Sequence, residues 1–169
     1  MWNDTDIPLA HLITFRSYGT WLHGDKRGSV DRFHNQYRAP YLPPNAKQLE
    51  YKKSLLSREI TTLNAKQRET IKNAIRETCD VRKWILRAIN IRTNHVHTVV
   101  SIGTAKPERA LNACKADATR KMRENGCWDS EDSPWADKGS KRNLWTERSV
   151  EKAIEYVLYG QGDDLPDFD

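Results

Sequence analysis

WILRAINIRTNHVHTVVSI, residues 84–102, is the stretch that predicts the centre of the fold. Two runs, 84–92 and 95–102, are rich in β-branched residues, and only Thr93 and Asn94 separate them. Runs of this composition form strands, and a short polar turn between two strands is typical of an antiparallel hairpin. We therefore expect a hairpin here, to which the rest of the chain adds further strands and helices.

The flanking segments predict these further elements. Asn64 and Gln67 form a potential capping box at the start of one helix, and Pro107 suits the first position of another. The expected elements are a strand over 9–15, helices over 46–56, 65–80 and 107–124, a strand within 127–145 near Trp145, and a helix after Thr146. Strands that adjoin in sequence favour an antiparallel sheet. The prediction is an α+β fold, a ferredoxin-like antiparallel sheet with helices packed on it. We expect a single domain over 1–169, in which 163–169 form a flexible acidic tail.

The composition predicts a cytoplasmic protein whose partner is a polyanion. The chain has 28 Lys and Arg against 23 Asp and Glu; four of these acids and none of the bases lie in the last nine residues, so residues 1–160 carry +9. Such a basic, aromatic-rich body favours nucleic acid as the partner, although a basic protein without that partner has the same composition. Three cysteines without a close pair argue against a disulfide framework. The sequence also lacks the apolar run of about 20 residues that a membrane span needs and the start typical of a signal peptide.

His95, Val96 and His97 form the most informative local pattern. Residues two apart in a strand project from the same face, so both imidazoles point to one side. Two neighbouring imidazoles on a rigid strand make half of a metal site. The alternative is a pair of ordinary histidines that pack or form hydrogen bonds.

The expected helix over 107–124, together with the residue before it, is rich in basic side chains. The candidate DNA-binding residues are Lys106, Arg109, Lys115, Arg120 and Lys121. A cationic helix of this kind can follow a nucleic-acid backbone. The alternative is an outer helix face that contacts only water.

The last helix carries two tyrosines, Tyr156 and Tyr159. With about 100° of rotation per residue, Tyr156 flanks the apolar stripe of this helix and Tyr159 lies almost opposite it. A phenol is a weak nucleophile at its ordinary pKa of about 10, but a cationic or metal-bound environment can activate it for phosphoryl chemistry. The alternative is a pair of surface or half-buried tyrosines without a chemical role.

In this order the segments resemble the single-tyrosine transposases of the HUH endonuclease superfamily, which include the REP-associated tyrosine transposases. The resemblance covers about residues 9 to 162. It is carried by LAHLITF (9–15), NHVHTVVS (94–101), the helix from KPER (106–109) to Lys121, and LWT (144–146) followed by AIEYV (153–157).

This resemblance implies a function and a set of site residues. His95 and His97 would lie on a central strand of a ferredoxin-like sheet and hold one divalent ion, Mg²⁺ or Mn²⁺, with help from a polar residue of the tyrosine helix. The tyrosine would attack single-stranded DNA, leaving a 5′-phosphotyrosine link and a free 3′-OH. The protein would thus be a metal-dependent transposase that nicks and rejoins DNA, acting as a homodimer on DNA hairpins near the cut.

Two positions depart from the family pattern. Family members often place the third ligand, Gln or Asn, four residues after the tyrosine, and Gly160 occupies that position here. Gln161 is therefore our candidate third ligand, which requires the helix to unwind at Gly160. Position in the family pattern favours Tyr156 over Tyr159 as the nucleophile.

Two alternatives remain for the whole chain. One is a non-catalytic ferredoxin-like nucleic-acid-binding protein descended from such a transposase. The other is a plasmid replication initiator or relaxase of the same superfamily, against which the short chain without a helicase-like domain argues.

Overall fold

A computed structural model describes residues 6–20, 47 and 58–168 of the chain. These residues form, in order, β1 (Ala10–Arg16), α2 (Ala65–Arg82), β2 (Ile85–Ile91), β3 (His95–Ser101), α3 (Pro107–Glu124), β4 (Ser140–Leu144) and α4 (Glu147–Tyr159). The predicted helix over 46–56 lies, apart from Lys47, outside the described residues. Each other predicted element is present within a few residues of its expected bounds.

The strands form one antiparallel sheet in the order β2-β3-β1-β4. The β2–β3 hairpin predicted from 84–102 is confirmed, and β3 is one of the two inner strands. β4 is the strand expected within 127–145, and it ends just before Trp145. The order β1, α2, β2, β3, α3, β4 is the ferredoxin-like arrangement, to which α4 is added. The predicted α+β fold class is therefore confirmed.

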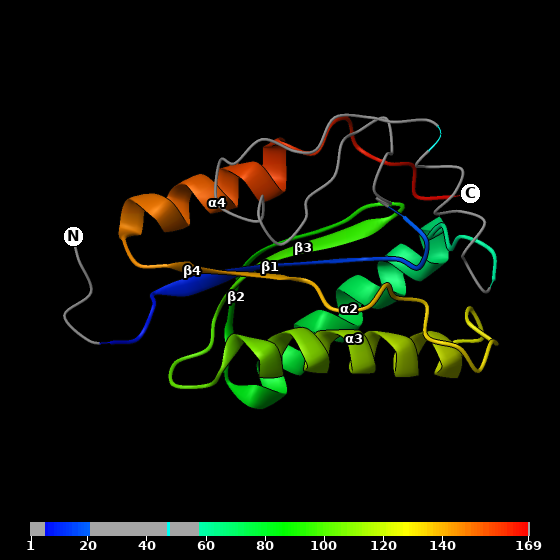
Figure 1. Ribbon diagram of the computed structural model, residues 1–169, viewed down its shortest axis with the longest axis horizontal. Helices are drawn as coiled ribbons and strands as arrows, with labels where there is room; N and C mark the ends of the chain where they lie inside the picture. Colours follow the sequence, from blue (N-terminus) through cyan, green and yellow to red (C-terminus); the bar gives the residue numbers. More distant parts are fainter. Residues whose placement is uncertain (1–5, 21–46, 48–57, 169) are drawn as a thin grey trace.

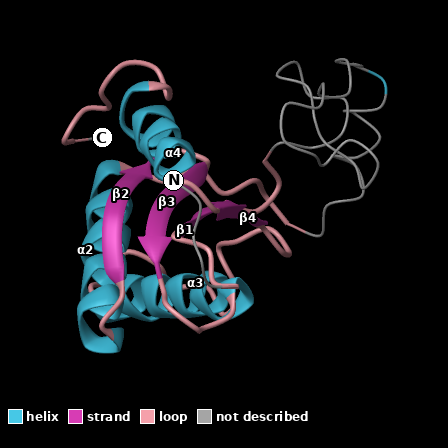
Figure 2. Cartoon of the chain, turned by 90° about the vertical axis from the view of Figure 1, so that its left-hand side faces the viewer, coloured by secondary structure: helices cyan, strands magenta, loops and turns pink. Residues whose placement is uncertain are grey.

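The helices cover opposite faces of the sheet. α2 and α3 lie together on one face and α4 crosses the other, as Figure 1 shows. Both α2 and α3 belong to β-α-β crossovers, which are almost always right-handed, so they pack on the same side of the sheet. The C-terminal α4 is not part of a crossover and takes the remaining face; Figure 2 shows it separated from α3 by the strands.

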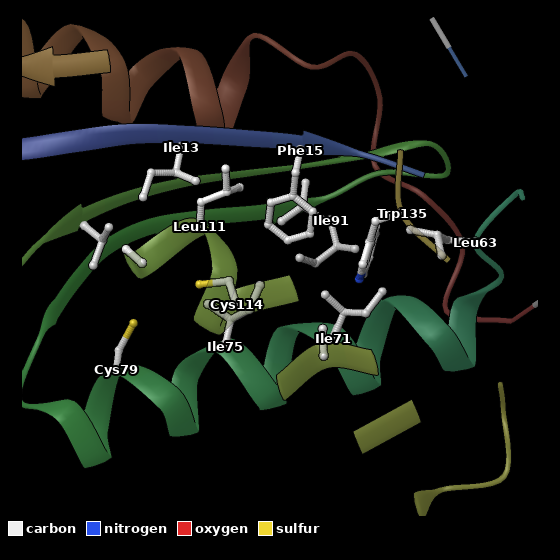
Figure 3. Close-up of a cluster of buried hydrophobic side chains, with 14 of the residues drawn as sticks. Ile13, Phe15, Leu63, Ile71, Ile75, Cys79, Ile91, Leu111, Cys114 and Trp135 are labelled. Carbon is white, nitrogen blue, oxygen red and sulfur yellow. The ribbon is translucent and has the colours of Figure 1, made fainter. Parts of the chain in front are cut away.

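Two apolar clusters correspond to these two faces. The larger one lies between the sheet and the pair α2 and α3, where Phe15, Ile71 and Trp135 meet (Figure 3). The smaller one lies under α4 and contains Val99, Val150 and Val157. The sheet is thus buried on both sides, although the cluster under α4 is smaller and leaves room for polar residues at one end.

The helix ends follow from local sequence. The predicted capping box of Asn64 and Gln67 is present at α2, and Thr146 caps α4 in the same way with Ser149. α4 ends at Tyr159 with Gly160 as its C-cap. The three cysteines are free thiols. Of the helices in the described residues, none is long and apolar enough to cross a membrane.

Candidate active site

The alternation of β3 places both histidines on the sheet face that α4 covers. Val96 and Val100 belong to the cluster beneath α2 and α3, whereas Val99 belongs to the cluster under α4. His95 and His97 have the same parity as Val99 and therefore share its face. Their ring centroids are 4.6 Å apart. The structure thus brings the two predicted ligands together on one side of the sheet.

His97 is held by the neighbouring strand β1. Its Nδ1 lies 2.7 Å from Oγ1 of Thr14, which is its register partner on β1. The residue is 2 % exposed, and its Nε2 is buried without a hydrogen-bond partner among the described residues. Burial, and then the charge of neighbouring His95, lower the pKa of His97 to about 3. The imidazole is therefore neutral at pH 7: Nδ1 is engaged by Thr14, Nε2 has no partner at hydrogen-bond distance among the described residues, and the Gln161 side chain offsets only part of the lowering of the pKa.

His95 is oriented by the residue before it and by Gln161. Its Nδ1 lies 2.6 Å from Oδ1 of Asn94, an atom that only accepts, so Nδ1 carries a proton and donates it. Its Nε2 lies 3.2 Å from Oε1 of Gln161. With the ring proton on Nδ1, the lone pair of Nε2 faces this carbonyl oxygen. Two lone pairs facing each other are stabilised by a cation bound between them.

Gln161 reaches His95 because α4 stops before it. Nε2 of Gln161 donates to the backbone carbonyl of Tyr156 at 2.9 Å, which turns Oε1 toward the histidine. A Cβ on Gly160 would lie 2.8 Å from the same carbonyl oxygen and 3.2 Å from Cδ2 of the Tyr156 ring. A side chain four residues after the tyrosine thus does not fit in this geometry, and the polar group comes from the fifth position instead.

α4 places Tyr156 beside His97. The helix is fixed to the sheet by its buried Val150, Ala153 and Val157, and Nδ2 of Asn90 on β2 donates to the backbone carbonyl of Val157 at 2.8 Å. The rings of Tyr156 and His97 meet edge to face, with their centroids 5.3 Å apart. Tyr156 is 43 % exposed, so its ring contacts the site from the solvent side.

Tyr159 is not part of this arrangement. It is 80 % exposed, as expected for a residue opposite the apolar stripe. The geometry therefore favours Tyr156 as the tyrosine of the site.

The donors present fit a divalent cation. No group of three His, Cys, Asp or Glu side chains converges within the part of the chain that the structure describes. The donor set is instead two imidazole nitrogens and one amide oxygen: Nε2 of His97, Nε2 of His95 and Oε1 of Gln161. A buried, unpaired imidazole nitrogen is costly for a fold unless a ligand uses it, which supports a metal at this position.

α3, which carries all the candidate DNA-binding residues except its N-cap Lys106, lies on the other face of the sheet from the histidines (Figure 1). Lys115 donates to the carbonyls of Ala136 and Lys138, and burial lowers its pKa. Arg120 forms ion pairs with neighbouring α3 carboxylates, and Lys121 does so with Glu77 on α2 as well. A DNA-binding role for α3 therefore stays a prediction. It would concern DNA bound on the α3 side of the sheet, and not the DNA strand that Tyr156 would attack.

Sequence reasoning missed three residues that shape the site, namely Thr14, Asn94 and Arg92. Thr14 and Asn94 orient the two histidines as described above. Arg92 precedes the β2–β3 turn, and its side chain donates to the backbone carbonyl of Asp163 at 2.8 Å. Asn94 adjoins His95 in sequence and could have been suspected. Thr14 could be identified only from the strand register, and Arg92 only from the path of the chain after α4.

The low pKa of His97 predicts how stability depends on pH. The folded state keeps this ring neutral, whereas the unfolded chain binds a proton below about pH 6.5. The unfolded state therefore binds more protons between about pH 6.5 and 3, so stability falls as the pH falls through this range, by up to about 1.4 kcal/mol per pH unit from this group. Urea unfolding of the metal-free protein at several pH values measures the slope. In His97→Leu this part of the slope should vanish; an unchanged slope would contradict the assignment.

Comparisons with known proteins bear on the family and the fold of the chain. The family model described as "Transposase IS200 like" matches residues 49–155, more than half of the chain, and the match ends one residue before Tyr156. A REP-associated tyrosine transposase, solved bound to a REP hairpin, is 11% identical with a TM-score of 0.50; the match covers 93% of this chain and 69% of that chain. A putative transposase from Deinococcus radiodurans R1 is 10% identical with a TM-score of 0.49, covering 93% of this chain and 94% of the other. No curated protein matches the chain.

Proposed function

Because the chain belongs to the IS200-like transposase family, we propose that it nicks and rejoins single-stranded DNA through a covalent link between Tyr156 and a 5′-phosphate. The observation that carries this proposal is the convergence of Tyr156 with two imidazoles, one of which keeps a buried, unpaired Nε2. A protein that only binds DNA gains nothing from that costly atom.

The proposed cofactor is Mg²⁺ or Mn²⁺, held by His95, His97 and Gln161. When bound, such an ion polarises the scissile phosphate and stabilises the charge that develops on its oxygens. Thr14 and Asn94 support this role because each fixes the Nδ1 side of one ring and so directs its Nε2 inward.

The proposed reaction is a displacement at phosphorus. Oη of Tyr156 attacks, the bond between phosphorus and the 3′-oxygen breaks, and a bond between phosphorus and Oη forms. The phenol loses its proton and the leaving 3′-oxygen gains one, so the products are a 5′-phosphotyrosine and a 3′-OH. Attack by another 3′-OH reverses the step and joins two strands. The packed α4 limits the motion of the tyrosine and so reduces the entropy lost in reaching this geometry.

The proposed substrate is single-stranded DNA next to a hairpin, and the proposed assembly is a homodimer. Support for DNA comes from the charge of +9 over residues 1–160. Arg16 adds local support. It pairs with His95 across the sheet and has the same parity on β1 as Thr14, so β1 places a cationic residue on the face of the sheet that carries the histidines. The related transposase that was solved with a REP hairpin makes a hairpin the first substrate to test.

The decisive experiment is adduct formation. The protein is incubated with a pool of single-stranded hairpin DNAs and Mn²⁺, and adducts that survive denaturation are separated on a gel. We expect a protein–DNA species that disappears when EDTA is added. Tight DNA binding without any adduct, across the pool and with either metal, would favour the non-catalytic DNA-binding alternative.

DNA binding is expected to depend steeply on salt and on strand state. Each phosphate neutralised by a base contributes a slope of about −0.7 in log K against log salt for single strands. Fluorescence anisotropy with a hairpin, a single strand and a blunt duplex of matched length measures both effects. We expect the duplex to bind most weakly. Equal affinity for all three, or a flat salt dependence, would contradict the proposal.

The α3 surface is tested in the same assay. Lys106→Glu combined with Arg109→Glu alters two exposed residues and leaves Lys115, which holds the loop before β4, in place. We expect weaker hairpin binding and a smaller salt slope if this face contacts DNA. Unchanged binding would remove α3 from the DNA interface.

A further inference from the structure

Gln161 is the only one of the three proposed ligands that lies outside a helix or strand. It follows the C-cap of α4 and stands between Gly160 and Gly162, the latter with φ +90°. Glycines on both sides give this short segment more backbone freedom than any other flanking residues would. The carbonyl of Tyr156 holds the amide of Gln161 from the helix, but the backbone after Gly160 needs a further anchor to keep Oε1 beside His95.

Arg92 provides such support. Its backbone N donates to the carbonyl of His95 at 2.8 Å, and its Nη2 donates to the backbone carbonyl of Asp163, also at 2.8 Å. One residue thus joins the strand that carries the histidines to the segment that carries Gln161. Asp163 is only two residues after Gln161, so the backbone between this anchor and the ligand has little freedom to move.

The segment after Gly162 is anchored a second time at α2. Arg68 in the first turns of α2 is 6% exposed; its Nη1 donates to the carbonyl of Leu63 and its Nη2 to the carbonyl of Pro166, each at 2.8 Å. Both arginines hold backbone carbonyls, whereas the carboxyl-bearing residues Asp163, Asp164 and Asp167 are exposed. The two arginines therefore fix the path of the backbone, and their role is more than electrostatic attraction to the acidic side chains.

We propose that Arg92 is a positioning residue: by holding the carbonyl of Asp163, it keeps Oε1 of Gln161 beside Nε2 of His95. The inference rests on the proposed function in so far as Gln161 is taken as a metal ligand. It also accounts for the unusual spacing, because a ligand five residues after the tyrosine, past the helix end, needs an anchor that a ligand on the helix does not.

The sign of the effect on metal affinity separates this role from simple electrostatics. Arg92 is a cation near His97 and contributes to lowering the pKa of that ring. If only its charge mattered, its removal would strengthen the binding of another cation. If Arg92 positions Gln161, its removal weakens metal binding, by the roughly ten- to hundredfold that loss of a supporting residue around a metal site costs.

The experiment is a double-mutant cycle on Mn²⁺ affinity, measured by calorimetry with Arg92→Ala, Gln161→Ala and the double variant. Residues that act through one contact are not additive, so we expect the double variant to bind Mn²⁺ no more weakly than Gln161→Ala alone. Arg92→Lys, which keeps a charge and a donor, should restore part of the affinity. Arg87→Ala is the matched control, an exposed arginine on β2 that bonds Ser101, and should change nothing.

A second readout needs no metal. The side-chain amide of Gln161, assigned by NMR in the metal-free protein, should shift and lose its hydrogen-bonded character in Arg92→Ala but not in Arg87→Ala. An unchanged amide signal, an additive cycle or tighter Mn²⁺ binding in Arg92→Ala would each overturn the proposal. If His97→Leu binds Mn²⁺ as well as the unaltered protein while the Gln161 amide still responds to Arg92→Ala, the metal site of the proposed function is wrong and the positioning role stands.

Discussion

Tyr156→Phe is expected to abolish the covalent protein–DNA adduct, to below detection, while DNA binding and the melting temperature stay unchanged. The substitution removes only Oη, the atom proposed to attack phosphorus. Without it the proposed bond between this residue and the 5′-phosphate cannot form. The adduct gel described above, run with both proteins at equal concentration, measures the loss.

The structure explains why folding should survive this change. Tyr156 is 43 % exposed, and its ring contributes the edge-to-face contact with His97, which a phenylalanine ring can keep. α4 is held on the sheet by Val150, Ala153 and Val157, none of which is altered. A loss of adduct in Tyr156→Phe therefore reports on the missing hydroxyl and not on a displaced helix.

Tyr159→Phe is the matched control. It makes the same chemical change three residues along α4, on a side chain that is 80% exposed, and we expect most of the adduct to remain. Loss of the adduct in Tyr159→Phe with retention in Tyr156→Phe would show that the wrong tyrosine was chosen. Retention in both would remove this helix from the chemistry. Mass spectrometry of the DNA-linked peptide identifies the residue directly.

The sequence predicted those features that depend on neighbours along the chain. The hairpin of β2 and β3, the capping box at Asn64 and the start of α3 at Pro107 are all set within a few residues. The shared face of His95 and His97 follows from strand periodicity alone. The candidate ligand Gln161 required the helix to unwind at Gly160, and α4 does end at Tyr159 with Gly160 as its C-cap.

The sequence could not predict relations that depend on the layers of the fold. The basic residues of α3 suggested a DNA-binding helix, but only the tertiary structure shows α3 on the face opposite His97 (Figure 1). The same holds for Lys115, whose charge suggested DNA but whose Nζ bonds the loop before β4. Arg92 and Arg68 meet the segment after α4 across long stretches of chain, and no local pattern marks either residue as an anchor.

The second large effect is expected at His97. His97→Leu should reduce metal-dependent nicking by about a hundredfold or more, since the stabilisation supplied by a metal ion at a phosphate amounts to several kcal/mol. Most substitutions that destroy activity at a buried position also destabilise the protein. Here the opposite is expected: in the metal-free state, leucine fills a similar volume and removes a buried Nε2 that has no partner among the described residues.

An unpaired buried polar atom costs about 1–3 kcal/mol, which offsets the lost contact between Nδ1 of His97 and Oγ1 of Thr14. We therefore expect the melting temperature of His97→Leu in EDTA to equal or exceed that of the unaltered protein. Added Mn²⁺ should raise the melting temperature of the unaltered protein only, because a ligand stabilises the folded state to which it binds. A variant that loses stability in EDTA would mean that His97 is a structural residue of the α4 interface.

Thr14→Val is the graded form of the same test. It keeps the shape of the side chain on β1 but removes the hydroxyl that meets Nδ1 of His97 at 2.7 Å. Nε2 of both histidines would remain, but the ring of His97 would lose the contact that fixes its orientation. We expect nicking and Mn²⁺ affinity to fall by roughly ten- to a hundredfold, between the unaltered protein and His97→Leu. Full activity in Thr14→Val would mean that packing against Tyr156, and not the bond from β1, sets the direction in which Nε2 of His97 points.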